Sequence, residues 1–353
     1  MCLQQEKRHM ELTNRNCKKL YVWAVFVLVS GIIGVVYSLS VGGQPKIAFT
    51  IGCVIGGGVV GFELFWIQQP IGAWLRGLPL LAFLTISTLV WTVIIAASLQ
   101  IIPRFFGLEQ IYGADYHATT FRQDIVVSLI VAFTINAVLR IRGLVGGRVL
   151  TNFLIGRYHR PLREQRVFLF LDLADSTHLS EKLGDVHVQS LIGQFFFDIA
   201  QPIAEHGGET HRYIGDEIVV TWPYSDAIKD ARCLECVFDI QKLIVTNSPR
   251  YQADFGVTPQ FRVGMHGGYV VASEVGDEKR EIVYFGDTIN TAARLQSLCK
   301  EKKTDFLISG EILEAITLPP NAKAQYMGDI ELRGKSNLLK VYALAHGVNL
   351  NAQ

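Results

Sequence analysis

The chain has 353 residues, of which 50% are hydrophobic and 18% are charged, and its formal net charge is +1 at pH 7. A near-neutral chain lacks the strongly basic surface with which proteins bind nucleic acid, so the composition argues against a nucleic-acid partner. The length allows more than one domain, and the long uncharged runs are concentrated in the first 145 positions.

Residues 1–19 form a polar, basic tail, and the apolar run after it lacks the cleavage pattern of a signal peptide. Four apolar runs follow, at about 20–41, 47–67, 78–102 and 125–141. The first three reach the ~20 residues that a helix needs to cross a bilayer, and the fourth can extend to Val145 if Arg140 and Arg142 reach the interface. We therefore expect an all-α transmembrane bundle of four helices over residues 20–145. Glycines in the second run, among them Gly52, indicate either close helix packing or glycine that lipid merely tolerates.

Basic residues flank the first and the fourth apolar run, whereas the segment between the third and fourth runs carries both signs of charge. By the positive-inside rule both termini are cytoplasmic, which agrees with an even number of spans. The sequence therefore predicts a multi-pass protein of the inner (plasma) membrane, with the bilayer as one partner and the C-terminal domain in the cytoplasm.

Residues 146–166 form a basic linker whose apolar residues Val149, Leu150, Phe153 and Leu154 have helical spacing. This pattern fits a helix that pairs with the same helix of a second chain and passes membrane events to the next domain. The basic residues fit attachment to anionic lipid equally well. Both interpretations stay open at this point.

An uncharged run at 167–171 is typical of a strand that is buried on both faces. Asp172 ends this strand, and a second carboxylate, Asp216, lies in a tight turn between predicted strands at 209–214 and 217–222. Four small or polar residues follow the first strand, namely Ala174, Asp175, Ser176 and Thr177. They start a helix, whose first N–H groups have no partner within the helix and can bind a phosphate.

Two carboxylates beside a phosphate-binding turn suit magnesium, which takes one or two protein carboxylates and completes its coordination with water and phosphate oxygens. The pattern therefore indicates a site for a nucleoside triphosphate. Each aspartate taken alone fits a helix cap or a turn residue. A third segment, 284–294, adds a Gly-Asp turn and a helix on which Asn290 and Arg294 share one face.

Further elements complete the predicted C-terminal domain. Helices are expected at 188–206 and 225–245, and strands near 261–266, 269–275 and 282–285. The order and type of these elements favour helices packed on a mainly antiparallel sheet with a βαβ entry. The chain is thus expected to be multi-domain, with an all-α bundle before an α+β domain.

Four segments of this domain, at 168–177, 212–217, 262–268 and 284–294, resemble the class III adenylate and guanylate cyclases in order and approximate spacing. The resemblance covers residues 167–345 and leaves 346–353 as a tail. Within the family, the chain resembles the membrane-anchored adenylate cyclases of bacterial type. The resemblance implies a nucleotidyl cyclase domain with a ferredoxin-like βαβ core.

The resemblance also implies roles for individual residues. Asp172, Asp216 and the backbone of Leu173 match the positions that bind two Mg²⁺ or Mn²⁺ ions, and Asn290 and Arg294 match those that stabilise the transition state. Residues 174–177 and a late basic residue match the phosphate-binding positions. That basic residue is either Arg333 or Lys335. Asp175 occupies a position where glycine is common, so Asp175 either caps the helix or perturbs the site. The family's active sites form between two head-to-tail domains, which implies a homodimer.

Two positions depart from the adenylate cyclase pattern. Arg212 and Val283 occupy base-reading positions where lysine and either aspartate or threonine are usual, and valine cannot hydrogen-bond a purine. We expect a lyase that converts ATP to 3′,5′-cyclic AMP and pyrophosphate in signal transduction. The alternatives are a guanylate or mixed-specificity cyclase, a diguanylate cyclase suggested by the turn at 214–217, and a catalytically silent nucleotide-binding receptor module.

Overall fold

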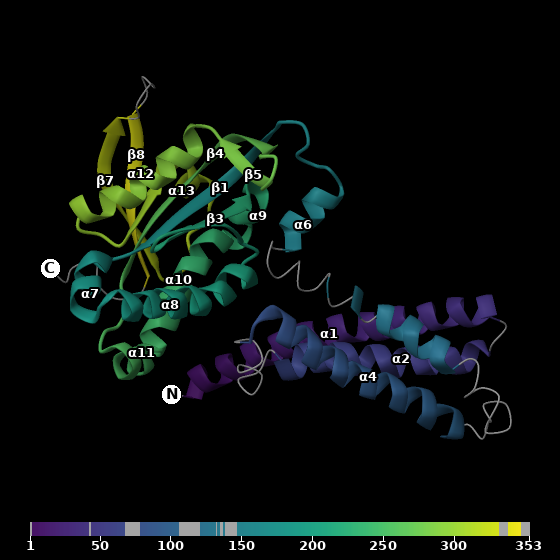
Figure 1. The fold of residues 1–353 in the computed structure, drawn as a ribbon. Helices are drawn as coiled ribbons and strands as arrows, with labels where there is room; N and C mark the ends of the chain where they lie inside the picture. Colours follow the sequence, from purple (N-terminus) through teal and green to yellow (C-terminus); the bar gives the residue numbers. More distant parts are fainter. Residues whose placement is uncertain are drawn as a thin grey trace. The chain divides into compact units, whose positions relative to one another are not determined.

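The structure, a computed structural model, describes residues 2–41, 44–67, 78–105, 121–131, 133–134, 137, 147–331 and 338–346. The chain divides into two compact units, Met1–Ile141 and Arg142–Gln353 (Figure 1). The described part of the first unit is helical, and the second unit contains a large sheet with helices on its faces.

Three long helical segments make up most of the described part of the first unit. They are α1 (Cys2–Val41), α2 (Pro45–Gly61), which continues into the π-helix η1 (Phe62–Ile67), and α4 (Leu80–Phe105). Stretches of these helices, Leu20–Ser40, Pro45–Trp66 and Ala82–Ile102, are long and apolar enough to cross a membrane. The basic tail at 1–19 is not a separate element, because α1 runs through it. The predicted fourth span at 125–141 lies partly outside the described residues.

Glycines allow α1 and α2 to pack closely. A Cβ atom on Gly34 would clash with the backbone carbonyl of Ala48, and one on Gly52 would clash with the backbone carbonyl of Ser30. Small residues at such contacts let two helix backbones approach each other. Of the two interpretations of the glycine-rich run, close packing is therefore the one observed at Gly52.

The second unit is built on one sheet with the strand order β2-β3-β1-β4-β6-β8-β7, and β5 pairs with β4. The strands are β1 (Leu162–Leu173), β2 (Glu209–Ile214), β3 (Glu217–Pro223), β4 (Phe261–Val275), β5 (Glu281–Phe285), β6 (Phe306–Ser309), β7 (Ala322–Glu331) and β8 (Leu338–His346). All pairings are antiparallel except the one between β4 and β6. The order β2-β3-β1-β4, with helices after β1 and β3, is that of a ferredoxin-like core and confirms the α+β prediction.

Helices cover both faces of this sheet (Figure 1). They are α6 (Gly147–Leu154), α7 (Ser176–Leu183), α8 (Asp185–Glu205), α9 (Tyr224–Ile228), the 3₁₀ turn η3 (Lys229–Ala231), α10 (Arg232–Thr246), α11 (Ser248–Phe255), α12 (Asp287–Glu301) and α13 (Gly310–Ala315). Side chains of β1 alternate between two cores: Leu169 and Leu171 pack with α8 and α10, whereas Phe168 and Phe170 pack with β5 and α12. Burial on both faces explains why 167–171 is uncharged, as predicted.

The segment before the sheet is part of the second core. The helix α6 ends at Leu154 and β1 begins at Leu162, so the linker is helical over a shorter range than expected. Val149 and Phe153 pack against the core that contains Phe168, and Tyr158 in the same core is 3% exposed. The apolar face of α6 therefore contacts its own domain, an arrangement that neither interpretation of the linker included.

Two other predictions about the elements were wrong. The helix expected at 225–245 is broken into α9, η3 and α10, because Asp230 and Ala231 adopt positive φ angles, which end an α-helix. The strands expected at 261–266 and 269–275 form one strand, β4, whose glycines pair with β1 instead of turning. A Cβ on Gly264 would clash with the backbone of α12, so glycine here lets the helix approach the sheet.

Candidate active site

The two predicted metal-binding carboxylates lie together at one end of β1. Asp172 stands opposite Glu217 in the antiparallel pairing of β1 with β3. The turn that contains Asp216 is held against the end of β1, because the Leu173 N–H donates to the Asp216 carbonyl at 3.4 Å. The carboxyl groups of Asp172 and Asp216 are within hydrogen-bonding reach of each other. The structure therefore brings these residues into one site.

Negative charge is concentrated at this site. Burial and then the charge of Asp216 raise the pKa of Asp172 to about 6. Burial, with the charges of Asp172 and Asp216, raises the pKa of Glu217 to about 7. Asp172 and Glu217 therefore resist ionisation beside Asp216, and a bound cation would stabilise their charged forms. Glu217 was not predicted as a site residue, although its place next to Asp216 was a signal for it.

Two further residues contact the carboxylates. Gln296, which is buried on α12, donates from Nε2 to Oδ2 of Asp172 at 3.2 Å. Arg262 stands opposite Asp172 on β4, and its positive charge opposes the rise in the pKa of Asp172. Sequence reasoning missed both residues, because neither the contact of α12 with the end of β1 nor the pairing of β1 with β4 is visible in a local pattern.

The donor set fits a hard divalent cation. Within the described ranges, no group of three or more His, Cys, Asp or Glu side chains is arranged to hold a metal ion by itself. Magnesium needs no such cage, since it takes one or two carboxylates and completes its shell with water and substrate phosphates. The mutual repulsion of Asp172 and Asp216 is the kind of strain that a bound cation would relieve.

The predicted phosphate-binding turn has a specific backbone. The N–H of Ala174 is already used, because it donates to the Gln260 carbonyl at 2.8 Å. Asp175 has a φ of 56°, a left-handed conformation that glycine adopts most readily, and its side chain makes no capping hydrogen bond. It lies 3.6 Å from Arg262 in an ion pair. Asp175 therefore stands at the N-cap position of α7 and its carbonyl accepts from the N–H of Leu179, but its side chain does not cap the helix.

Asn290 and Arg294 lie on the exposed side of α12. Asn290 is six residues from Gln296, which corresponds to about 120° around a helix. Gln296 contacts Asp172, whereas Arg294 donates from Nη1 to the Glu331 carbonyl at 2.6 Å. In the described polar contacts of a single chain, neither Asn290 nor Arg294 meets the two aspartates. The structure thus separates the two halves of the predicted catalytic set.

The remaining predicted positions are divided between described and undescribed segments. Arg212, on β2, is exposed and its Nη2 lies 2.5 Å from Oε2 of Glu281. Val283 is half-buried on β5. Arg333 and Lys335 lie outside the described residues.

Residues 161–346 match the family model of the adenylate and guanylate cyclase catalytic domain. The chain belongs to this family. It is 36% identical to Adenylate cyclase 2 of Rhizobium meliloti (strain 1021) over 330 residues, which cover 93% of this chain and 86% of that protein. The four segments that carried the resemblance lie inside the matched region, so the resemblance to the cyclase family is confirmed.

Other relatives are similar over the catalytic domain. Adenylate cyclase 1 of Rhizobium meliloti (strain 1021) is 26% identical over 185 residues, 51% of this cyclase and 27% of that protein. A solved structure of a bacterial light-regulated adenylyl cyclase has a TM-score of 0.53 at 17% identity, and covers 63% of this chain and 64% of that one. At that identity the likeness shows the fold alone. The match to Adenylate cyclase 2 is longer than the catalytic domain and therefore includes part of the N-terminal unit.

Proposed function

We propose that this cyclase is a membrane-anchored adenylate cyclase that converts ATP to 3′,5′-cyclic AMP and pyrophosphate in signal transduction. The observation that carries the proposal is the pairing of Asp172 with Asp216 at the end of β1, in a chain of the cyclase family. The name of the relative with 36% identity supports ATP as the substrate. In the described residues, three long apolar helices support a multi-pass membrane anchor. The basic residues that flank the first and the fourth apolar run support a cytoplasmic catalytic unit.

In this mechanism Asp172 and Asp216, with the backbone of Leu173, would hold two Mg²⁺ or Mn²⁺ ions. Such ions lower the pKa of the ribose 3′-hydroxyl and neutralise the charge of the triphosphate. Gln296 fixes the orientation of Asp172 through its hydrogen bond to Oδ2. The first turn of α7, at Ser176 and Thr177, would bind phosphate oxygens, as would Arg333 or Lys335.

The second half of the site would come from another copy of the chain. Asn290 would orient the ribose, and Arg294 would stabilise negative charge that develops on the α-phosphoryl group. Both side chains are exposed on α12, away from the face that carries Gln296. This exposure supports a head-to-tail homodimer in which each of two equivalent sites uses residues of both chains.

The shared site can be tested by mixing two inactive variants. Asp172→Ala and Arg294→Ala should each be nearly inactive, but a heterodimer carries both lesions in one site and leaves the other intact. Random pairing should restore about a quarter of the wild-type activity, because half of the dimers are mixed and each has one intact site.

A matched control uses Asp172→Ala with Asp216→Ala. In that heterodimer both sites lack one aspartate, so activity should not return. If pull-down shows that Asp172→Ala and Arg294→Ala form heterodimers that remain inactive, the shared site is wrong.

A guanylate or mixed-specificity cyclase is the second candidate, because Val283 offers the base no hydrogen bond. A catalytically silent nucleotide-binding module is disfavoured, since Asp172, Asp216, Asn290 and Arg294 are all present. Assays with ATP and GTP, in which cyclic AMP, cyclic GMP and cyclic diguanylate are separated, distinguish all of these candidates. Formation of cyclic GMP alone would overturn the choice of ATP.

A further inference from the structure

Arg262, near the start of β4, is surrounded by carboxyl groups. It stands opposite Asp172 in the pairing of β1 with β4, and residues opposite each other in an antiparallel pair share one face of the sheet. The guanidinium of Arg262 lies 3.6 Å from Oδ1 of Asp175. Burial raises the pKa of Asp305, and the positive charge of Arg262 opposes this rise. Of these three acidic residues, Asp172 and Asp175 stand at the predicted metal and phosphate positions.

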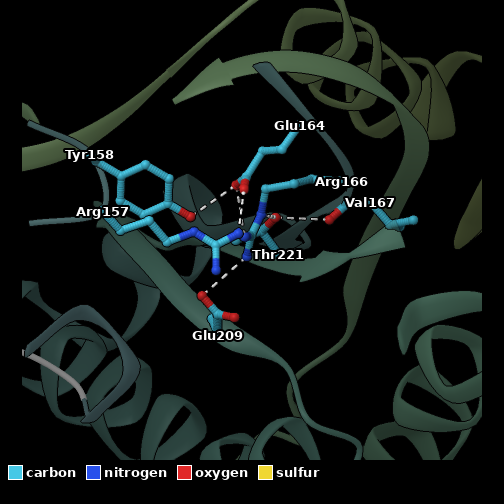
Figure 2. A network of polar contacts seen from close by, with 7 residues as sticks. All are labelled: Arg157, Tyr158, Glu164, Arg166, Val167, Glu209 and Thr221. Carbon is cyan, nitrogen blue, oxygen red and sulfur yellow. Dashed lines mark hydrogen bonds and ion pairs between the residues drawn. The ribbon is translucent and has the colours of Figure 1, made fainter. Parts of the chain in front are cut away.

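Another arginine of the same sheet shows how this domain satisfies a buried guanidinium (Figure 2). The side chain of Arg166 is 4% exposed. It donates from Nε to Thr221 Oγ1 at 3.0 Å, from Nη1 to Glu164 at 3.1 Å and from Nη2 to Glu209 at 3.0 Å. All three nitrogen atoms of this guanidinium donate to protein acceptors, so Arg166 has little capacity left for a ligand.

Arg262 is satisfied far less completely. Its side chain is 20% exposed, and within the described residues it takes part in the ion pair with Asp175 but in no hydrogen bond. A guanidinium has five N–H donors, and polar groups that are largely buried are normally hydrogen-bonded. The donors of Arg262 are therefore available to an anionic ligand, and the planar guanidinium suits a phosphate.

The carboxylate of Asp175 is beside Arg262 but is not fixed there. The φ of Asp175 is 56°, in the left-handed region that few residues other than glycine, asparagine and aspartate adopt. Its side chain is 62% exposed and makes no capping hydrogen bond to α7. An ion pair with so exposed a partner contributes little to stability, so a stronger anion can replace Asp175 at Arg262.

We propose that Asp175 is a built-in competitor of the triphosphate for Arg262. A triphosphate bound to cations at Asp172 would lie beside Arg262, because the two residues are opposite each other on β1 and β4. Its phosphate oxygens would replace the Asp175 carboxylate, since a phosphate can accept two parallel N–H bonds from one guanidinium. The displaced carboxylate stays close to the phosphates, and its negative charge opposes their binding. This inference rests on the proposed cyclase function.

The competition predicts effects on binding and on kinetics. An exposed ion pair and one nearby like charge each change an equilibrium by a small factor, so removing the charge of Asp175 should tighten triphosphate binding by about 3- to 10-fold. The same change should lower KM for ATP and strengthen inhibition by pyrophosphate. It should not raise kcat, because Asp175 already leaves Arg262 when the substrate binds, before the transition state forms.

The test measures the binding of inorganic tripolyphosphate to the full-length protein by calorimetry with Mn²⁺ present, so that neither a base nor turnover contributes. Asp175→Asn removes the charge and keeps a residue that tolerates the left-handed conformation, whereas Asp175→Gly also removes the backbone constraint. Both variants should bind tripolyphosphate about 3- to 10-fold more tightly than wild type. Asp185→Asn is the matched control, because it removes an equal charge from the exposed first turn of α8. It should leave the affinity unchanged.

A second background tests the role of the arginine. Asp175→Asn should change the affinity of the Arg262→Gln protein by less than about twofold, because the two side chains act on each other. If Arg262→Gln does not fold, the comparison of the two Asp175 variants still decides.

Unchanged or weaker binding in both Asp175 variants, or tighter binding in Asp175→Gly alone, overturns the inference and leaves the proposed function standing if cyclic nucleotide forms. A wild-type protein that binds no tripolyphosphate also overturns it. The proposed function itself fails only if the wild-type protein forms no cyclic nucleotide.

Discussion

Replacing Asp172 by asparagine should stabilise the metal-free protein while it abolishes cyclisation. The pKa of Asp172 is raised from 3.8 to about 6 by burial and by Asp216. A shift of this size corresponds to about 3 kcal/mol of unfavourable free energy in the ionised form. Because the group is only half-buried, solvent screening reduces this to about 1.5 kcal/mol. Asparagine removes the charge and can still accept the hydrogen bond from Gln296.

The size of the effect depends on pH. The folded protein holds the proton of Asp172 up to pH about 6, whereas the unfolded chain releases it near pH 3.8. The wild-type protein therefore loses stability as the pH rises through this window, and Asp172→Asn does not. At pH 8 the variant should be more stable by about 1.5 kcal/mol, and near pH 4 the difference should be close to zero.

The measurement is the thermal unfolding midpoint of the full-length protein in EDTA, at both pH values. A gain of about 3–6 °C is expected at pH 8 for a unit of this size. Asp277→Asn, in the exposed turn between β4 and β5, serves as the control and should shift the midpoint little. A variant that is less stable than wild type at pH 8, or a gain that does not depend on pH, would refute the reasoning.

Two further predictions follow from the same domain. Asp216→Ala should remain folded, as judged by its unfolding midpoint. It should lose turnover with both Mg²⁺ and Mn²⁺, because a single remaining carboxylate leaves the proposed metal site incomplete; wild-type turnover would contradict the metal assignment. Burial, then Arg212 and Arg166, lower the pKa of His211 from 6.5 to about 4, so the folded protein loses stability as the pH falls through this window. Between pH 7 and pH 5, the free energy of unfolding measured in urea should fall by about 1–2 kcal/mol less for His211→Asn than for wild type. An equal fall would show that His211 does not titrate as described.

The parts of the fold that could be predicted from the sequence are those set by local patterns. Strand burial and turn chemistry act over a few residues. The uncharged run at 167–171 and the turn at Asp216 were therefore enough to predict three strands and the meeting of two carboxylates. The uninterrupted β4 was missed because it depends on tertiary packing, as the contact of Gly264 with α12 shows. The break at Asp230 was missed because neither Asp230 nor Ala231 is a glycine, so the sequence gives no signal for a positive φ there.

Contacts at the site were missed for the same reason, because they too depend on tertiary packing. Gln296 reaches Asp172 only because α12 packs across the end of β1. The contact of Arg212 with Glu281, which lies apart from the carboxylates, likewise forms only because two strands from different places in the sheet meet. Long-range contacts of this kind leave no periodic signal in a single sequence.

The packing of Tyr158 shows that the folded catalytic unit begins before the region that matches the family model. The region of family similarity begins at residue 161, but Tyr158 lies in the second core, donates to Glu164 at 3.0 Å, and has its carbonyl bonded to the N–H of Glu274. A fragment that begins at residue 161 would lack Tyr158, so part of the second core would be exposed to solvent and Glu164 would lose the hydrogen bond from the Tyr158 hydroxyl. The smallest independently folding piece should therefore start near Gly147, and movement of the segment from Gly147 to Tyr158 would alter the core of the enzyme directly.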